Sequence, residues 1–113
     1  MVSNPAATAF DLVGYSAHAG GLDNAATVLA ELSESINPRE LVSTAALSPA
    51  PWAQRLGYLF GLVGAKEHAD ALSEHVARSP HETVLLDPGG PKSGALRDAR
   101  WKLLVNVEVE PDL

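Results

Sequence analysis

Ser16 comes nearest to a nucleophilic catalytic motif in this sequence, within the stretch GYSAHAGG at residues 14–21. A nucleophile elbow places a serine between two glycines, where a strand turns sharply into a helix. Here His18 stands in the position of the second glycine, and the residues before Ser16 have the spacing of a helix. We therefore predict a loop that ends a helix, and keep a small hydrolase built on Ser16 and a histidine as a remote alternative.

The stretch DPGGPKSG, residues 87–94, contains the glycine, lysine and serine of a phosphate-binding loop but not their spacing. Pro91 stands directly before Lys92, where the motif needs glycine, and proline has no N–H to donate to a phosphate. The residues that follow are too few to form the helix whose N-terminus would hold the anion. We predict a flexible connector.

Three of the four histidines fall within or just after one predicted helix. His68 and His75 stand seven residues apart, whereas metal ligands on a helix usually stand four apart and need a further ligand, which His81 would have to supply. A solvated helix face explains the pattern better. The sequence contains no cysteine, which excludes disulfides, thiolate nucleophiles and Cys-ligated zinc. We predict no metal, no cofactor and no enzymatic activity.

Half of the basic residues lie close together near the C-terminus, around Trp101: Lys92, Arg97, Arg100 and Lys102. They are a candidate interface for an anionic partner, such as RNA, DNA or an acidic protein surface. The alternative is that they pair with carboxylates of the same chain, which is the commoner use of such clusters. The net charge of -6 argues against broad coating of nucleic acid, because phosphate binding needs a surplus of cations.

The C-terminal stretch from Trp101 to Val109 alternates between apolar and polar residues, as a strand with one covered face does. The polar face is a second part of the candidate interface, and Leu104 is the exception on it. Two acids at its end are also typical of an edge strand that resists aggregation. The polar residues that we single out on this face are Lys102, Asn106, Glu108 and Glu110.

The elements that position these residues are five helices followed by two strands, which predicts a single α+β domain over residues 1–113. Apolar spacing, proline and glycine signals place the helices within residues 4–78, at about 4–15, 22–36, 38–47, 52–64 and 66–78, with 48–51 as a linker. The fourth helix, the most apolar segment, should be the central one. The strands, at about 83–86 and 101–109, should form an antiparallel hairpin packed on the helices, since a lone ribbon is marginal.

The sequence shows no targeting segment and no membrane span. The longest uncharged apolar stretch, residues 56–65, is well short of the roughly 20 residues that cross a bilayer. We predict a cytoplasmic protein that does not enter the membrane.

Three segments in order resemble antitoxins of the AbiE abortive-infection type. VSNPAATAFDLVGY resembles the "(T/S)-x-P-x-x-T-x-x-D-L" element that follows their DNA-binding region. HAGGLDNAATVLAEL and PWAQRLGYLFGLVG resemble their middle part, in which "Q-R-L-G-Y-L" is typical, and LLDPGGPKSG with RWKLLVNVEVE resembles their closing segment. The residues that match are Pro5, Thr8, Asp11, Leu12, Gln54, Arg55, Leu56, Gly57, Tyr58, Trp101 and Asn106.

This resemblance implies the C-terminal domain of an antitoxin from a bacterial type IV toxin–antitoxin system. It implies a non-catalytic antitoxin role against a nucleotidyltransferase-like toxin, and support of operon autoregulation in a full-length protein. The family's winged-helix domain would precede Met1, so DNA contact through that element is not carried over, and the chain is either an excised domain or a short relative.

Most of the matching residues look structural, with Gly57 allowing close packing in the central helix and Asn106 available to a loop or partner. Arg55, a guanidinium on an apolar helix, should have a carboxylate partner or an interface use, and Asp11 is the candidate partner. A protein-interaction or homo-oligomerisation module without antitoxin role remains the alternative.

Overall fold

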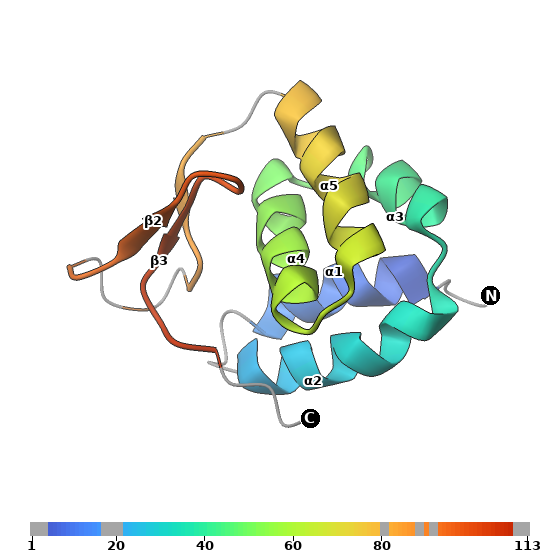
Figure 1. Ribbon diagram of the computed structural model, residues 1–113, viewed down its shortest axis with the longest axis horizontal. Coiled ribbons are helices and arrows are strands. Elements are labelled where there is room, and N and C mark those ends of the chain that lie inside the picture. Colours follow the sequence, from blue (N-terminus) through green and yellow to red (C-terminus); the bar gives the residue numbers. More distant parts are fainter. Residues whose placement is uncertain (1–4, 17–21, 80–81, 88–89, 91–92, 110–113) are drawn as a thin grey trace.

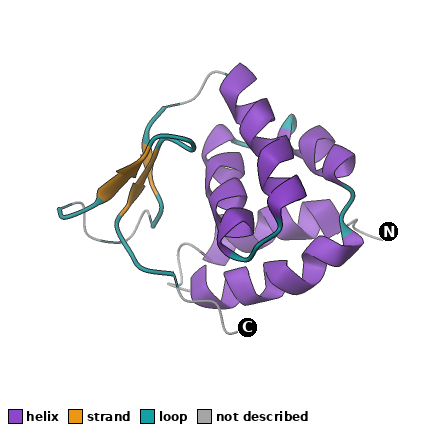
Figure 2. Ribbon diagram, in the orientation of Figure 1, coloured by secondary structure: helices purple, strands orange, loops and turns teal. Residues whose placement is uncertain are grey.

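Five α-helices precede a small sheet in the computed structural model, which confirms the predicted α+β class (Figures 1 and 2). The structure describes residues 5–16, 22–79, 82–87, 90 and 93–109. The helices are α1 (Pro5–Ser16), α2 (Leu22–Leu32), the 3-10 turn η2 (Ser33–Ser35), α3 (Pro38–Ala45), α4 (Ala50–Leu62) and α5 (Lys66–Arg78). The sheet lies on one side of the helices, next to α4 and α5 (Figure 1).

The helix boundaries follow from local signals at their ends. Asn37 caps α3 by accepting a hydrogen bond from the backbone N–H of Arg39 at 2.8 Å, and Pro38 occupies the first turn. Helix α4 starts two residues earlier than predicted, because Pro51 serves its first turn rather than belonging to a linker. Gly64, at φ +82°, ends α4 in the left-handed conformation that suits glycine.

Helix α4 is the centre of the core, as predicted. It packs against α1, α2, α3 and α5. Its side chains Leu56, Leu59 and Phe60 are fully buried, and burying each contributes roughly 1.5–3 kcal/mol. The fully buried side chains that surround it include Phe10, Val13, Leu29, Leu41 and Leu72.

The sheet differs from the predicted hairpin. It has three strands, β1 (Val84–Leu85), β2 (Leu96–Asp98) and β3 (Leu103–Val105), in the order β1-β3-β2. The first strand pairs with β3 in parallel, and the antiparallel hairpin is formed by β2 and β3. The prediction missed β2 because its sequence, LRD, has neither an apolar alternation nor β-branched residues.

The last strand is also shorter than the predicted range 101–109. Trp101 and Lys102 belong to the turn after β2, where Lys102 adopts φ +50°, and regular pairing ends at Val105. The apolar side of the pattern still faces the core beyond Val105, since Val107 and Val109 pack against the core while Glu108 is exposed. The period-2 pattern therefore identified the covered face correctly but not the length of hydrogen-bonded strand.

None of the helices in the described part of the chain combines the length and the apolar character that a bilayer crossing requires.

Candidate functional site

Gln54 connects the helices to the sheet from the middle of α4. Its side chain is fully buried, and its Nε2 donates to the carbonyl oxygens of Trp101 at 2.8 Å, Glu82 at 2.9 Å and Lys102 at 3.3 Å. One amide therefore holds both the segment before β1 and the turn between β2 and β3. Its Oε1 is buried and has no hydrogen-bond partner among the described residues, so the contact depends on the two N–H groups.

Arg55 makes the next link, and its partner is not the predicted Asp11. Its Nε donates to the carbonyl oxygen of Leu85 in β1 at 3.0 Å, and its side chain is only 9% exposed. Burial lowers the pKa of Arg55, while the negative charge of Asp87 raises that pKa and opposes the shift. Asp11 is exposed on α1 and forms no ion pair among the described residues. The predicted pair of Arg55 with Asp11 is therefore wrong.

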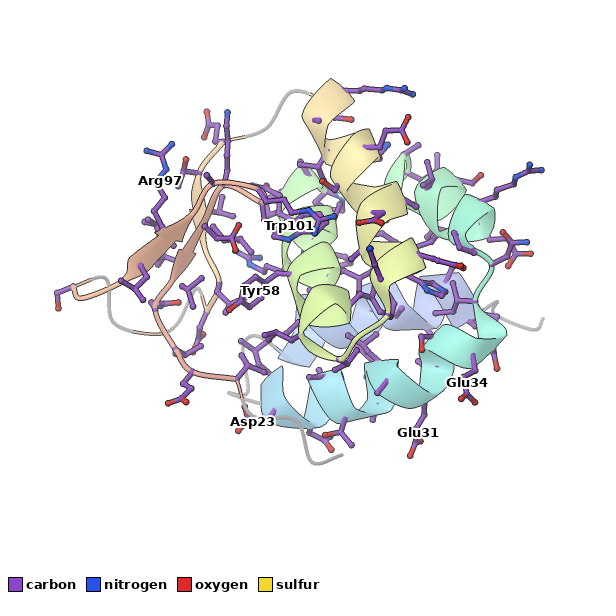
Figure 3. The ribbon with its side chains drawn as sticks, viewed as in Figure 1. Asp23, Glu31, Glu34, Tyr58, Arg97 and Trp101 are labelled. Atoms are coloured by element: carbon purple, nitrogen blue, oxygen red, sulfur yellow. The ribbon has the colours of Figure 1, made fainter. Side chains whose placement is uncertain are left out.

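Gly57 allows the indole of Trp101 to lie directly on α4. A Cβ built at this glycine would overlap the six-membered ring of Trp101, which is itself 3% exposed. The neighbouring Arg100 guanidinium lies over the same indole, 5.1 Å from the ring centroid, and its Nη2 is 2.7 Å from Oδ1 of Asp70 on α5. The turn between β2 and β3 is thus fixed to both α4 and α5 (Figure 3).

Asn106 fixes the chain at the opposite end of β1 and β3 from Gln54. Its Nδ2 donates to the carbonyl oxygen of Asp87 at 2.8 Å, and its Oδ1 accepts from the backbone N–H of Asp87 at 2.9 Å. This reciprocal pair joins the second residue after β1 to the first residue after β3. Asn106 therefore reaches a loop of its own chain, one of the two uses expected for it.

Beside these contacts lies an open groove between the inner face of the β2–β3 hairpin and the end of α4, with a volume of about 540 Å³. Tyr58 and Leu62 line it from the helix, and Leu96 and Val105 line it from the sheet. The segment after β3 adds two apolar and two polar residues to the lining: Asn106, Val107, Glu108 and Val109. Burial raises the pKa of Tyr58, and the charge of Asp98 raises it further. We call this feature the hairpin groove.

The predicted basic cluster divides in the structure. Arg100 pairs with Asp70, which is the self-paired interpretation. Arg97 is exposed and Lys102 half-buried, and neither makes an ion pair within the described ranges. Lys92, His81 and Glu110 lie outside the described residues.

The catalytic and metal alternatives gain no supporting geometry. The side chain of Ser16 and residues 17–21 lie outside what the structure describes, as does part of the 87–94 connector. His68 does not lie on a solvated face as predicted: it is half-buried, with Nε2 2.7 Å from the carbonyl oxygen of Ile36 and its ring 5.3 Å from that of Phe60. Within the described part, no three His, Cys, Asp or Glu side chains gather as a metal site would need.

Sequence reasoning missed several partners because they are backbone atoms or small residues. The carbonyls of Glu82 and Leu85 carry no side-chain signal, although a glutamine in a buried helix does indicate that acceptors must exist nearby. The sequence does not indicate the packing role of Gly14, where a Cβ would overlap the indole of Trp52. That glycine lets α1 and α4 pack closely.

Comparison with protein families gives one match, to the model described as the AbiEi antitoxin C-terminal domain, over residues 1–62. The match covers just over half of the 113 residues, from before α1 to the end of α4. It includes Gln54, Arg55 and Gly57, but Trp101 and Asn106 lie beyond it. Neither the curated proteins nor the solved structures contain a match to this chain.

Proposed function

The chain belongs to the AbiEi antitoxin C-terminal domain family, and we propose that it acts as the non-catalytic antitoxin domain of a type IV toxin–antitoxin system. Its target would be a nucleotidyltransferase-like toxin of the same bacterial cell. In a longer protein the domain would support autoregulation of the operon, with DNA contacted by a preceding winged-helix domain. The observation that carries this proposal is the family match over residues 1–62.

A non-catalytic role is supported by how the polar residues of α4 are used. Gln54 and Arg55 direct their N–H groups to carbonyl oxygens of the same chain. Asn106 does the same on the other side of the sheet. Side chains whose donors bond these carbonyl oxygens hold the backbone in place. A catalytic group must instead reach a reacting atom of a substrate.

We propose that these contacts present the β2–β3 hairpin and its groove as the working surface of the antitoxin. Of the residues expected at an interface, Arg97, Lys102 and Glu108 lie on or after this hairpin. Lys92 and Glu110 remain predictions for the same surface. Arg55, Arg100 and Asn106 would then serve the surface indirectly, by holding it in place.

The test is rescue of growth. The 113-residue chain is co-expressed with a nucleotidyltransferase-like toxin from the same cell, and colony formation is counted. Rescue is expected for the chain and for Gly61→Leu, because a Cβ at this exposed helix position meets nothing within 4 Å. Gly57→Leu should lose rescue, because the hairpin is displaced. Failure of the unaltered, folded chain to rescue would refute a sufficient antitoxin role.

A further inference from the structure

Strand β2 is an edge of the sheet. The order β1-β3-β2 leaves it paired on one side only, through Leu96 with Val105, Arg97 with Leu104 and Asp98 with Leu103. An edge strand offers a row of unpaired N–H and C=O groups to another chain. Figure 1 shows β2 as the strand farthest from the helices, so none of the helices in the described part of the chain covers that edge.

The two faces of β2 have different chemistry. Paired residues of neighbouring strands share a face, and successive residues alternate between faces. Leu96 pairs with Val105, and Val105 packs against the core, so both belong to the face toward α4. Arg97 belongs to the opposite face, and Figure 3 shows its side chain directed away from the helices, while Tyr58 is directed from α4 toward the sheet.

The inner face of β2 carries Leu96 and Asp98, and its apolar residue is largely uncovered. Leu96 is 75% exposed, and Leu62, which lines the same groove from α4, is 42% exposed. Leu47, the other large apolar side chain that is exposed in the described ranges, lies after α3 and lines none of this groove. Two of the three exposed large apolar residues therefore converge on one groove beside one free strand edge.

The charge on the outer face disfavours a second copy of this chain as the occupant in the register with the most pairing. Pairing β2 with β2 across a two-fold axis in full overlap would set Arg97 opposite Arg97 and Leu96 opposite Asp98. Like charges placed directly opposite destabilise a strand pair. Arg97 has no ion pair in the described part of the chain, and an acidic residue of a partner would complement its charge.

We propose that the free edge of β2 binds an extended segment of a partner protein as an added strand, with an apolar residue next to Leu96 over the hairpin groove and an acidic residue next to Arg97. The backbone of the segment pairs with β2, and its alternate side chains enter the groove. In strand addition the main-chain hydrogen bonds provide affinity and the side-chain pockets provide specificity. This inference holds whether or not the chain is an antitoxin, because it uses only the geometry of the hairpin.

The experiment titrates the 15N-labelled, full-length chain with peptides of about ten residues that alternate valine with a charged residue. One peptide carries Glu at the charged positions, a second carries Lys, and a third is the Glu peptide with N-methyl groups along one edge. We expect the Glu peptide to shift the amide signals of residues 94–98 and 105–109, and to bind about fivefold or more tightly than the Lys peptide. The N-methylated peptide should not bind if its methylated edge is the one that pairs.

Two variants sharpen the result without disturbing the fold, since both side chains are exposed. Arg97→Glu should reverse the preference so that the Lys peptide binds more tightly. Leu96→Ser should weaken both peptides. An unchanged amide spectrum away from the hairpin confirms that each variant is folded.

Three outcomes would overturn the proposal. One is absence of shifts at residues 94–98 with every peptide at about 1 mM. Another is equal affinity for the Glu and Lys peptides, which would remove the role of Arg97. The third is concentration-dependent dimerisation in sedimentation, with shifts at residues 94–98 in the chain alone, which would make a second copy the occupant of this edge.

Discussion

The helices and the sheet of this chain are stabilised in different ways. The helices bury their apolar faces around α4, and many side chains share that core. The sheet buries Leu86, Trp101 and Leu103, but its placement also depends on single polar contacts made by Gln54, Arg55 and other residues. We infer that single substitutions at the contact between α4 and the sheet disturb the sheet more than single surface substitutions disturb the helices.

The largest effect should come from filling the space at Gly57. Gly57→Leu has to displace the buried indole of Trp101, and we expect a loss of about 4 kcal/mol in the free energy of unfolding. Gly61→Leu is the matched control on the same helix, where the new side chain has open space. It should be neutral or stabilising by up to about 0.8 kcal/mol, because leucine favours a helix over glycine.

Urea denaturation followed by circular dichroism measures both variants. Equal stability of Gly57→Leu and Gly61→Leu would mean that the close contact between α4 and Trp101 does not contribute to the fold.

The next largest effect concerns the donor role of Gln54. Gln54→Glu replaces two N–H groups with a carboxylate that faces carbonyl oxygens in a buried place, and should cost about 3 kcal/mol at neutral pH. Gln54→Met loses the donors but also removes the unpartnered Oε1, so its cost should be nearer 1–2 kcal/mol. Hydrogen exchange at residues 82–85 and 101–104 should rise in both variants while exchange in α1 and α2 changes little.

At lower pH the Gln54→Glu variant should recover part of its stability. Protonation restores an O–H donor and removes a buried charge, so the neutral form is favoured in the folded state. A variant that is destabilised equally at pH 7 and pH 4 would contradict the assignment of a donor role.

The same contrast explains what the sequence could predict. Helices are encoded locally: the Asn37-Pro38 start of α3 and the glycine after α4 were visible without any tertiary information. The parallel pairing of β1 with β3 was not visible, because it depends on β2 lying between them in sequence and on a turn at residues 99–102.

The candidate site was predicted as a set of residues rather than as a set of contacts. The segment QRLGY was singled out through its resemblance to a family, and its buried glutamine and arginine required partners. Those partners are carbonyl oxygens, such as that of Trp101, 47 residues after Gln54. Because every residue has a carbonyl oxygen, the sequence cannot indicate which one accepts the hydrogen bond. For this reason the prediction for Arg55 was a side chain, that of Asp11.

A smaller effect should appear at alkaline pH through Tyr58. Burial and Asp98 raise the pKa of Tyr58 in the folded chain. The folded state therefore holds its proton more strongly than the unfolded chain, in which the pKa is about 10. The stabilisation is fully present below about pH 10 and is lost as the pH rises toward the folded pKa.

Denaturation at pH 9 and above pH 10 tests this linkage. Tyr58→Phe should reduce the loss of stability between the two conditions, and Asp98→Asn should reduce it by less, since burial is the larger cause. A loss of the same size in the Tyr58→Phe variant would assign the pH dependence to other groups.

The smallest expected effect compares two ion pairs: one between the hairpin turn and α5, and one within α5. Arg100→Ala removes the contact of the hairpin turn with Asp70 and with the indole of Trp101, and should cost about 0.5–1 kcal/mol because the ion pair is half exposed. Arg78→Ala removes a more exposed pair with Glu74 inside α5, and should cost about 0.3 kcal/mol or less. Hydrogen exchange at residues 101–104 should rise only in Arg100→Ala, since of these two arginines it is Arg100 that joins the sheet to the helices. If hydrogen exchange at residues 101–104 rose equally in both variants, the effect of Arg100 would come from the stability of α5. The hairpin would then be held by Gln54 and Trp101 and not by Arg100.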